Sequence, residues 1–411
     1  MLGFFAVFSE LEDMETLRQR VAAAAGGLGV IDYVSNILQA ERAVSARRDA
    51  IDGAVILVAS GGTEAIINQI VFQTAKPVLL WANPDNNSLA ATLEAYAALK
   101  TRFPLKVAYA PLGGDEAVSV IDGFAHIAAA IARIDEGVIG CFGAPAPWLL
   151  TSHGIHSFRE FKTRIANFKL EKLLERYDLV SASQAHAVVH SLASQAAVIE
   201  TTDADFLDSA RLYLAMRDMI EAHQLTALTV RCYDLLDSGI APCLGISLLN
   251  DEGIVAGCEG DLEAVFTMVL ASALNSGPSW TADALRIDRS ANALTLSHCT
   301  APCTMLHDPM SLKVAMQPDV RRGAALQGSL REGPVTILRF GAGFGSLLIA
   351  PGRIVASGIE AGHVMAQVEL AGSVESWLEH APGNHQIVLH GDVRERALAF
   401  CAFKHVTPIV V

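Results

Sequence analysis

The feature that most constrains this 411-residue chain is the alternation, in its first third, of short β-branched runs with longer Ala/Leu-rich helical patterns. This alternation is typical of βαβ units and predicts a parallel sheet. The runs predict strands over residues 2–8, 54–59, 77–81, 106–109 and 138–142. Helices are expected over residues 14–25, 63–74, 88–101 and 117–134.

Two further patterns of residues follow along the chain. A second α/β unit is expected from Gly137, with helices over residues 158–176 and 205–223 and a strand over 225–231. After Asn292, short strands separated by Gly and Pro indicate an antiparallel sheet or small barrel. The predicted architecture is therefore two Rossmann-like parallel-sheet α/β domains and a mainly antiparallel, barrel-like β domain, over residues 1–136, 137–292 and 293–411.

Composition excludes several classes of function. A formal net charge of −14 would repel a phosphate backbone, so nucleic acid is not an expected partner. The longest apolar runs, such as residues 53–59, are strand-sized, and no membrane span or secretory leader is expected. The seven cysteines form no C-x-x-C pair, which favours a reducing cytoplasm.

Three glycine-rich or polar segments have plain structural interpretations. Polar loops over residues 60–64 and 83–88 follow strands, where α/β proteins bind ligands, but Thr63 and Ser88 are more simply helix N-caps. The stretch 341–345 precedes a strand rather than a helix, so it predicts a hairpin turn and not a nucleotide loop.

Cys299 and Cys303 resemble half a zinc site, yet no second Cys/His pair with finger spacing follows.

Side chains that could bind a metal ion occur in three Gly-flanked or apolar segments. Taken alone, each of these acids is more simply a helix cap or a surface residue, and a single histidine usually has a structural role. Hard oxygen ligands with one imidazole would suit Mn²⁺ or Mg²⁺ better than a thiolate-binding ion. The three segments are Cys258-Glu259-Gly260-Asp261, Trp280-Thr281-Ala282-Asp283 and Gly383-Asn384-His385, the last followed by His390-Gly391-Asp392.

The order and surroundings of these residues resemble the L-fucose isomerase family and its L-arabinose isomerase relatives, over about residues 229–392. The first half of the chain matches in architecture, with weaker echoes near residues 60–64, 86–89 and 145–148. The runs that carry the resemblance are Thr229-Val230-Arg231-Cys232-Tyr233-Asp234, Ala241-Pro242-Cys243, Leu249-Asn250-Asp251-Glu252-Gly253, Cys258-Glu259-Gly260-Asp261, Ala282-Asp283, Leu296-Ser297-His298-Cys299-Thr300-Ala301-Pro302 and Gly383-Asn384-His385.

The resemblance implies a site and a reaction. Glu259, Asp283 and His385 would hold a Mn²⁺ ion (or Mg²⁺ or Co²⁺), and the two carboxylates would also be the catalytic acid/base pair of an aldose-ketose isomerase. Such an enzyme moves a proton between C1 and C2 of a sugar through an enediolate, and a divalent ion acidifies the C–H proton. The expected substrate is a pentose, a 6-deoxyhexose or a related sugar.

Further roles are expected for residues near these ligands. His298 would hydrogen-bond the sugar and Trp148 would form an apolar wall, although a structural histidine and a core tryptophan are equally compatible with the sequence. Asp261 and His390 would orient the ligands.

Other activities and the assembly are also part of the expectation. An epimerase or aldol-type lyase could use the same metal site, and a non-catalytic sugar-binding protein could keep the same fold. The family resemblance further implies a trimer or hexamer, in which the first domain of one subunit closes over the metal site of its neighbour.

Overall fold

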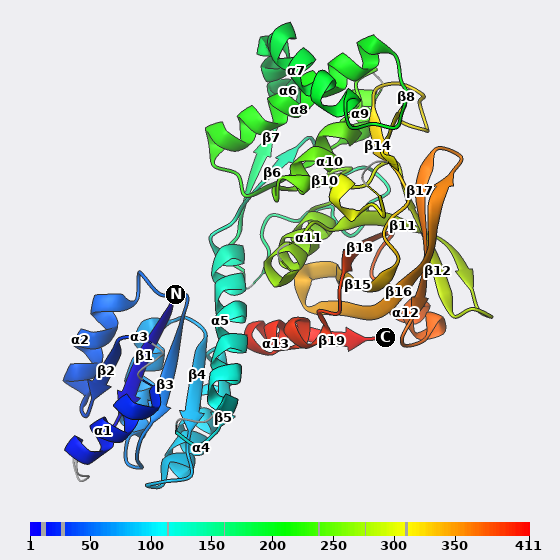
Figure 1. Ribbon diagram of the computed structural model, residues 1–411. Helices are drawn as coiled ribbons and strands as arrows, with labels where there is room; N and C mark the ends of the chain where they lie inside the picture. The colour runs from blue at the N-terminus through cyan, green and yellow to red at the C-terminus, as the bar shows by residue number, and fades with distance from the viewer. Residues whose placement is uncertain are drawn as a thin grey trace. The chain divides into compact units, whose positions relative to one another are not determined.

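The computed structural model of the protein describes residues 1–9, 14–25, 29–112, 115–159, 161–236, 239–275, 277–308 and 311–411. The chain divides into two compact units (Figure 1). The first consists of Met1–Arg133 with Ala399–His405, and the second of Ile134–Leu398 with Val406–Val411.

The first unit is built on a five-stranded sheet in the order β2-β1-β3-β4-β5, and all of its strand pairs are parallel. This is a strand order of doubly wound α/β sheets. The strands are β1 (Leu2–Val7), β2 (Ile31–Val34), β3 (Gly53–Val58), β4 (Val78–Ala82) and β5 (Leu105–Tyr109), and the helices are α1 (Met14–Ala25), α2 (Ile37–Arg47), α3 (Glu64–Thr74), α4 (Ser88–Leu99) and α5 (Asp115–Asp135). The predicted parallel α/β class is confirmed.

Helix α5 is the longest apolar helix of the described chain. By length and composition, Glu116–Asp135 could cross a membrane, and half of its most apolar stretch is buried within the protein. Gly53 of β3 leaves room for this helix, because a Cβ at Gly53 would lie 2.8 Å from the Cβ of Ala128 and 3.0 Å from the ring of Phe124.

The polar loops of the first unit fold onto their own strand ends. Ser88 donates its hydroxyl to the carbonyl of Val58 and accepts from the backbone N–H of Asn83 at 3.0 Å, so it links two strands rather than capping α4. Thr63 stands at the N-cap position of α3, yet its hydroxyl donates to the carbonyl of Ser60 and makes no capping bond. The expectation that Thr63 is an N-cap residue is confirmed, although its side chain makes no capping bond, and the expectation that Ser88 is one is wrong, because Asn87 holds that position.

A second parallel sheet, in the order β10-β9-β6-β7, opens the second unit. It contains β6 (Val138–Phe142), β7 (Arg164–Phe168), β9 (Ala227–Val230) and β10 (Val255–Cys258). The prediction of one helix over residues 158–176 is wrong, because residues 164–168 pair with β6 as an edge strand before α6 (Leu170–Leu179) begins. The other helices in this α/β part of the second unit are α7 (Ala182–Ala193), α8 (Asp203–His223), α9 (Cys232–Leu236), α10 (Cys243–Asp251) and α11 (Leu262–Asn275).

The C-terminal part of the second unit is a closed antiparallel barrel. Its sheet runs β15-β18-β11-β12-β17-β16-β19. An additional antiparallel β15–β16 pairing closes the ring, and β19 pairs with β16 in parallel outside it. The strands are β11 (Trp280–Asp288), β12 (Ala293–His298), β15 (Gly333–Phe340), β16 (Ser346–Glu360), β17 (His363–Leu370), β18 (His385–His390) and β19 (Thr407–Val410). This confirms the predicted barrel-like fold, and residues 341–345 form the expected β15–β16 connection.

Smaller elements complete the described chain. They are the three-stranded sheet of β8 (Val198–Glu200), β13 (Lys313–Ala315) and β14 (Ala325–Gln327), the 3-10 turns η1 (Cys303–Met305) and η3 (Ala342–Phe344), and the helices α12 (Val374–His380) and α13 (Arg394–Lys404).

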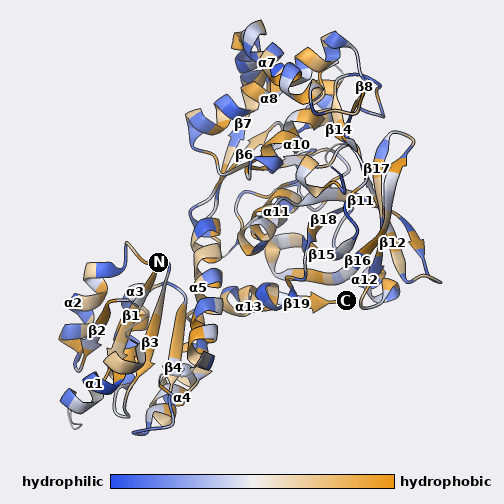
Figure 2. Cartoon of the chain, viewed as in Figure 1, coloured by the Kyte–Doolittle hydropathy of each residue, from blue (hydrophilic) through white to orange (hydrophobic). Residues whose placement is uncertain are grey.

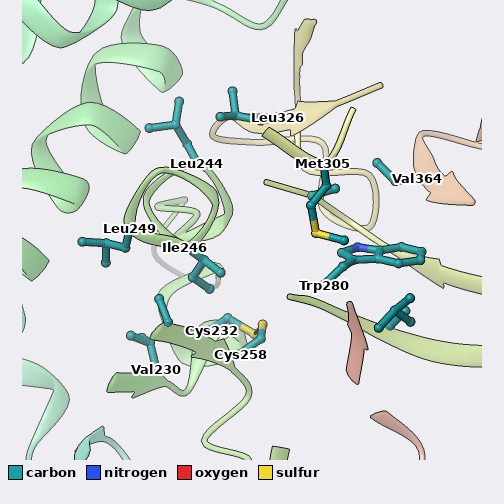
Figure 3. Close-up of a cluster of buried hydrophobic side chains, with 14 of the residues drawn as sticks. Val230, Cys232, Leu244, Ile246, Leu249, Cys258, Trp280, Met305, Leu326 and Val364 are labelled. Atoms are coloured by element: carbon teal, nitrogen blue, oxygen red, sulfur yellow. Dashed lines mark hydrogen bonds between the residues drawn. The ribbon is translucent and has the colours of Figure 1, made fainter. Parts of the chain in front are cut away.

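Each unit has its own apolar core, visible as the orange strands and inner helix faces of Figure 2. In the second unit the core runs continuously from the parallel sheet to the barrel. Figure 3 shows this region, with Trp280 of β11 beside Met305, and Cys232 and Cys258 turned toward each other. Because this core joins the two sheets, the end of β10 and the barrel strands are held as one body.

Candidate active site

Asp283 and His385 are brought together by strand register. They are direct partners in the antiparallel pairing of β11 with β18. Ser297 of β12 is the partner of Asp283 on its other side, and His298 follows it at the end of that strand. Ligand atoms of Asp283, His298 and His385 consequently lie within 4.8 Å of one another.

Glu259 reaches the same place from the parallel sheet. It follows β10 directly and has a φ of 61°, in the left-handed region that non-glycine residues avoid. Gly260 is also left-handed, and a Cβ there would lie 2.8 Å from the carbonyl oxygen of Ala144 and 2.9 Å from the Cα of Pro145. Strained backbone of this kind gathers at functional sites, where the surrounding structure holds it in place.

The imidazole of His385 faces both carboxylates. Its Nε2 lies 3.8 Å from Glu259 Oε1 and 3.8 Å from Asp283 Oδ1. The ring is fully buried, and this nitrogen has no hydrogen-bond partner among the described residues. A buried nitrogen without a partner is energetically costly. Its position facing two carboxylates would allow the three side chains to share a metal ion.

The other ring nitrogen of His385 is held by Asp261, with 2.8 Å between Nδ1 and Oδ2. Asp261 is itself fully buried and accepts from the hydroxyl of Ser152 at 2.9 Å, the backbone N–H of Ala264 at 2.8 Å and Arg339 at 3.1 Å. Burial would raise the pKa of Asp261, but the nearby charge of Arg339 and these hydrogen bonds hold it well below its usual value. Asp261 therefore orients the ring of His385, whereas His390 lies at the opposite end of β18 from His385.

The protonation of His385 and Glu259 follows from the same contacts. Burial would lower the pKa of His385, yet its hydrogen bond to Asp261 and the nearby carboxylate of Glu259 raise it to about 10. Burial would raise the pKa of Glu259, but His385 and Trp148 favour its ionised form and lower it. At neutral pH and without an ion, the site therefore holds a carboxylate at Glu259 and an imidazolium at His385.

Trp148 contacts Glu259 directly. Its indole Nε1 donates to Glu259 Oε2 at 2.6 Å, and its ring stands edge-on to Tyr233 with 4.8 Å between centroids. The side chain is 51% exposed, so it is not a core residue. The structure thus places all five predicted site residues, Glu259, Asp283, His385, His298 and Trp148, around one centre.

A pocket of about 280 Å³ opens beside this centre. It is lined by residues of the parallel sheet's carboxyl edge and of the barrel, which are Cys232, Tyr233, Leu236, Cys243, Cys258, Glu259, Asp283, Leu285, Ser297, His298, Cys299, Gln317, Asp319, Glu360, Ala361, His363 and Met365. The pocket therefore contains two of the three predicted metal ligands and one predicted sugar contact.

Sequence reasoning missed the thiols of this pocket. The sulfur atoms of Cys232 and Cys258 are 3.2 Å apart beside Glu259. The thiol of Cys243 and the imidazole of His363, despite opposing burial, hold the pKa of Cys299 at about 5. Cys303, which the sequence grouped with Cys299, belongs to none of the described clusters that could hold a metal ion, whereas Cys299 is grouped with Asp319 and His363. The only signal in the sequence was the presence of Cys232, Cys243, Cys258 and Cys299 in the runs that resemble a known family.

Comparison with known proteins gives one consistent result. No protein-family model matches the chain. A sulfoquinovose isomerase of Clostridium sp. (strain MSTE9) is 29% identical over 213 residues, which are 49% of this chain and 48% of that protein. This chain is similar to sulfoquinovose isomerases.

Two further relatives have the same name. The sulfoquinovose isomerase of Alkalicoccus urumqiensis is 27% identical over 157 residues, 37% of this chain and 35% of its own length. That of Priestia aryabhattai is 32% identical over 124 residues, 29% of this chain and 28% of its own length. The chain thus spans less than half the length of each of these curated relatives.

Proposed function

We propose that the protein is a metal-dependent aldose-ketose isomerase with its active site at Glu259, Asp283 and His385. The observation that carries the proposal is the buried Nε2 of His385, which has no partner among the described residues and faces two carboxylates in a pocket. The names of the relatives support the same reaction class.

The donor set fits a divalent ion such as Mn²⁺, Mg²⁺ or Co²⁺. Two carboxylate oxygens and one imidazole nitrogen converge, and Asp261 supplies the carboxylate that such metal-binding histidines have on their other nitrogen. When bound, such an ion would polarise the sugar carbonyl and stabilise negative charge that develops on the sugar oxygens. Glu259, Asp283 and His385 would hold it, and His298 lies close enough to contact the ion or the sugar.

Glu259 and Asp283 would each carry one of the two proton transfers of the reaction. Ionised at neutral pH, Glu259 is suited to remove the C2 proton of an aldose and return it to C1, while Asp283 moves the hydroxyl proton between O2 and O1. Trp148 donates to Oε2 of Glu259 and leaves Oε1 turned toward the centre. The half-exposed ring of Trp148 forms one wall for the sugar.

The charge of the pocket favours an uncharged sugar. Four carboxylates line it, those of Glu259, Asp283, Asp319 and Glu360. Among its described lining residues none is Arg or Lys, and only His298 and His363 could balance an anion. Glu360 is paired with Arg286, and bound metal ions would offset the other carboxylates. A sulfonate such as that of sulfoquinovose would still lack a free Arg or Lys among these lining residues, whereas a pentose or 6-deoxyhexose needs none.

A substrate screen tests the proposal. The protein, loaded with Mn²⁺, is incubated with pentoses, 6-deoxyhexoses and sulfoquinovose, and ketose formation is followed by NMR. We expect conversion of a neutral aldose that stops when a chelator is added. If no aldose is isomerised with any of the three divalent ions, the proposed function is wrong.

A further inference from the structure

A second cluster of metal-capable side chains lies in the same pocket, on a wall formed by other residues. Cys299 follows β12, Asp319 lies in the loop between β13 and β14, and His363 begins β17. Their ligand atoms all lie within 4.8 Å of one another. The mechanism proposed above uses none of the three.

The spacing of these atoms matches shared coordination of an ion. The Sγ of Cys299 is 3.6 Å from Asp319 Oδ2, and the Nε2 of His363 is 3.3 Å from Asp319 Oδ1. Tetrahedral zinc with ligands at about 2.0–2.3 Å separates those ligands from one another by roughly 3.3–3.6 Å. The Cys299–Asp319 contact also has the length of an S–H···O hydrogen bond, whereas the His363–Asp319 spacing is longer than the roughly 2.7–3.2 Å of a direct N–H···O bond.

The buried side chain of Gln317 hydrogen-bonds to two residues of the cluster. The side chain of Gln317, which is 1% exposed, donates its Nε2 to Asp319 Oδ2 at 2.7 Å and to Cys299 Sγ at 3.5 Å. Its Oε1 accepts the backbone N–H of Val320 at 2.9 Å, which fixes the loop that carries Asp319. Outer contacts of this kind orient the ligands of protein metal sites.

We propose that Cys299, Asp319 and His363 form a second metal site, selective for a borderline divalent ion of the Zn²⁺ or Co²⁺ type. One thiolate, one imidazole and one carboxylate suit such ions, whereas the two carboxylates and one imidazole of the first site suit harder ions as well. All three side chains line the pocket, so the ion keeps an open coordination position toward its interior.

Cobalt titration of the metal-free, reduced protein tests this site independently of enzymatic activity. Coordination of Co²⁺ by a thiolate produces a sulfur-to-metal charge-transfer absorption that oxygen and nitrogen ligands do not give. Because the first site can also take Co²⁺, we expect this band to reach its full intensity within two equivalents of Co²⁺ per chain. Cys299→Ser should abolish it, and His363→Ala should weaken Co²⁺ binding at this site by at least about tenfold.

Two controls make the assignment specific. Cys303→Ser removes another half-buried thiol, next to Asp251 instead of Asp319, and should leave the band unchanged. His385→Ala removes a ligand of the first site and should also leave it unchanged. If Cys299→Ser does not fold, as judged by circular dichroism, Asp319→Asn and His363→Ala carry the test. The proposal is overturned if wild-type protein gives no band, or if the band survives in Cys299→Ser and therefore belongs to the Cys232–Cys258 pair.

Discussion

The hydrogen bond between His385 Nδ1 and Asp261 Oδ2, 2.8 Å long, determines which ring nitrogen faces Glu259 and Asp283. Asp261 is ionised because its pKa is held far below the usual value, so it only accepts and Nδ1 must carry a proton. Nε2 is then the nitrogen available to a metal ion. Asp261 thus determines the orientation of the His385 ring without itself facing Glu259 or Asp283.

Asp261→Asn should weaken Mn²⁺ binding by about 10–100-fold, the usual cost of losing an outer-shell carboxylate. The amide oxygen still accepts from Nδ1, but the negative charge that makes the imidazole a better ligand is lost. Isothermal titration calorimetry measures the change. Ser152→Ala, which removes another hydrogen bond to Asp261 and keeps its charge, serves as the control. Unchanged Mn²⁺ affinity in Asp261→Asn would contradict this role.

Glu259→Gln and Asp283→Asn should each lower kcat by about 10²–10⁴-fold, because each removes a proton-transfer group. Both variants should keep the thermal stability of the wild type to within a few degrees. Asp288→Asn is the matched control, since Asp288 is an exposed carboxylate on the same strand as Asp283. Near-normal turnover in either site variant would remove that residue from the mechanism.

Metal binding at the first site should release a proton. Without an ion His385 is protonated at neutral pH, because its pKa is about 10, and coordination requires the neutral ring. The apparent Mn²⁺ affinity should therefore rise by about tenfold per pH unit and level off near pH 10. Calorimetry in buffers of different ionisation enthalpy counts the released protons. An affinity that is flat between about pH 7 and about pH 9 would show that His385 is not a ligand.

Iodoacetamide at about pH 6.5 should alkylate Cys299 ahead of Cys141, Cys243, Cys258, Cys303 and Cys401. The pKa of Cys299 is about 5, so it is a thiolate at that pH, whereas burial and neighbouring groups raise the pKa values of those other thiols. Peptide mapping by mass spectrometry identifies the site. Cys303, also half-buried, is the internal comparison, and its earlier modification would refute the assignment.

A closed homo-oligomer, a trimer or hexamer, remains our prediction for the assembly. In it, the exposed Asn86 and Asn87 of one subunit's first unit would face Glu259 of another. Co-expression of Glu259→Gln subunits with Asn86→Ala/Asn87→Ala subunits should then recover activity that neither variant has alone. Sedimentation of an active monomer at assay concentration would exclude this arrangement.

Local pattern was enough to predict the main elements and the class of fold. The β-branched runs of β3, β4 and β6 are fully buried, so their apolar character is visible in the sequence without knowledge of their neighbours. Edge strands lack this signal. β2 has only four, largely half-buried residues, and the sequence pattern does not predict it. β7 has no buried residue, and the pattern there predicts a helix instead. Their strand conformation depends on pairing with β1 and β6.

The residue types of the first site were likewise evident from sequence, and only the tertiary structure decided how they meet. Asp283 and His385 become neighbours through the register of β11 and β18, and Glu259 joins them from a different sheet. In the cluster of Cys299, Asp319 and His363 only Cys299 had a sequence signal, and that signal did not point to the other two, because each residue comes from a separate segment of the second unit. Strand register and barrel closure depend on contacts between distant segments, which no local pattern of residues encodes.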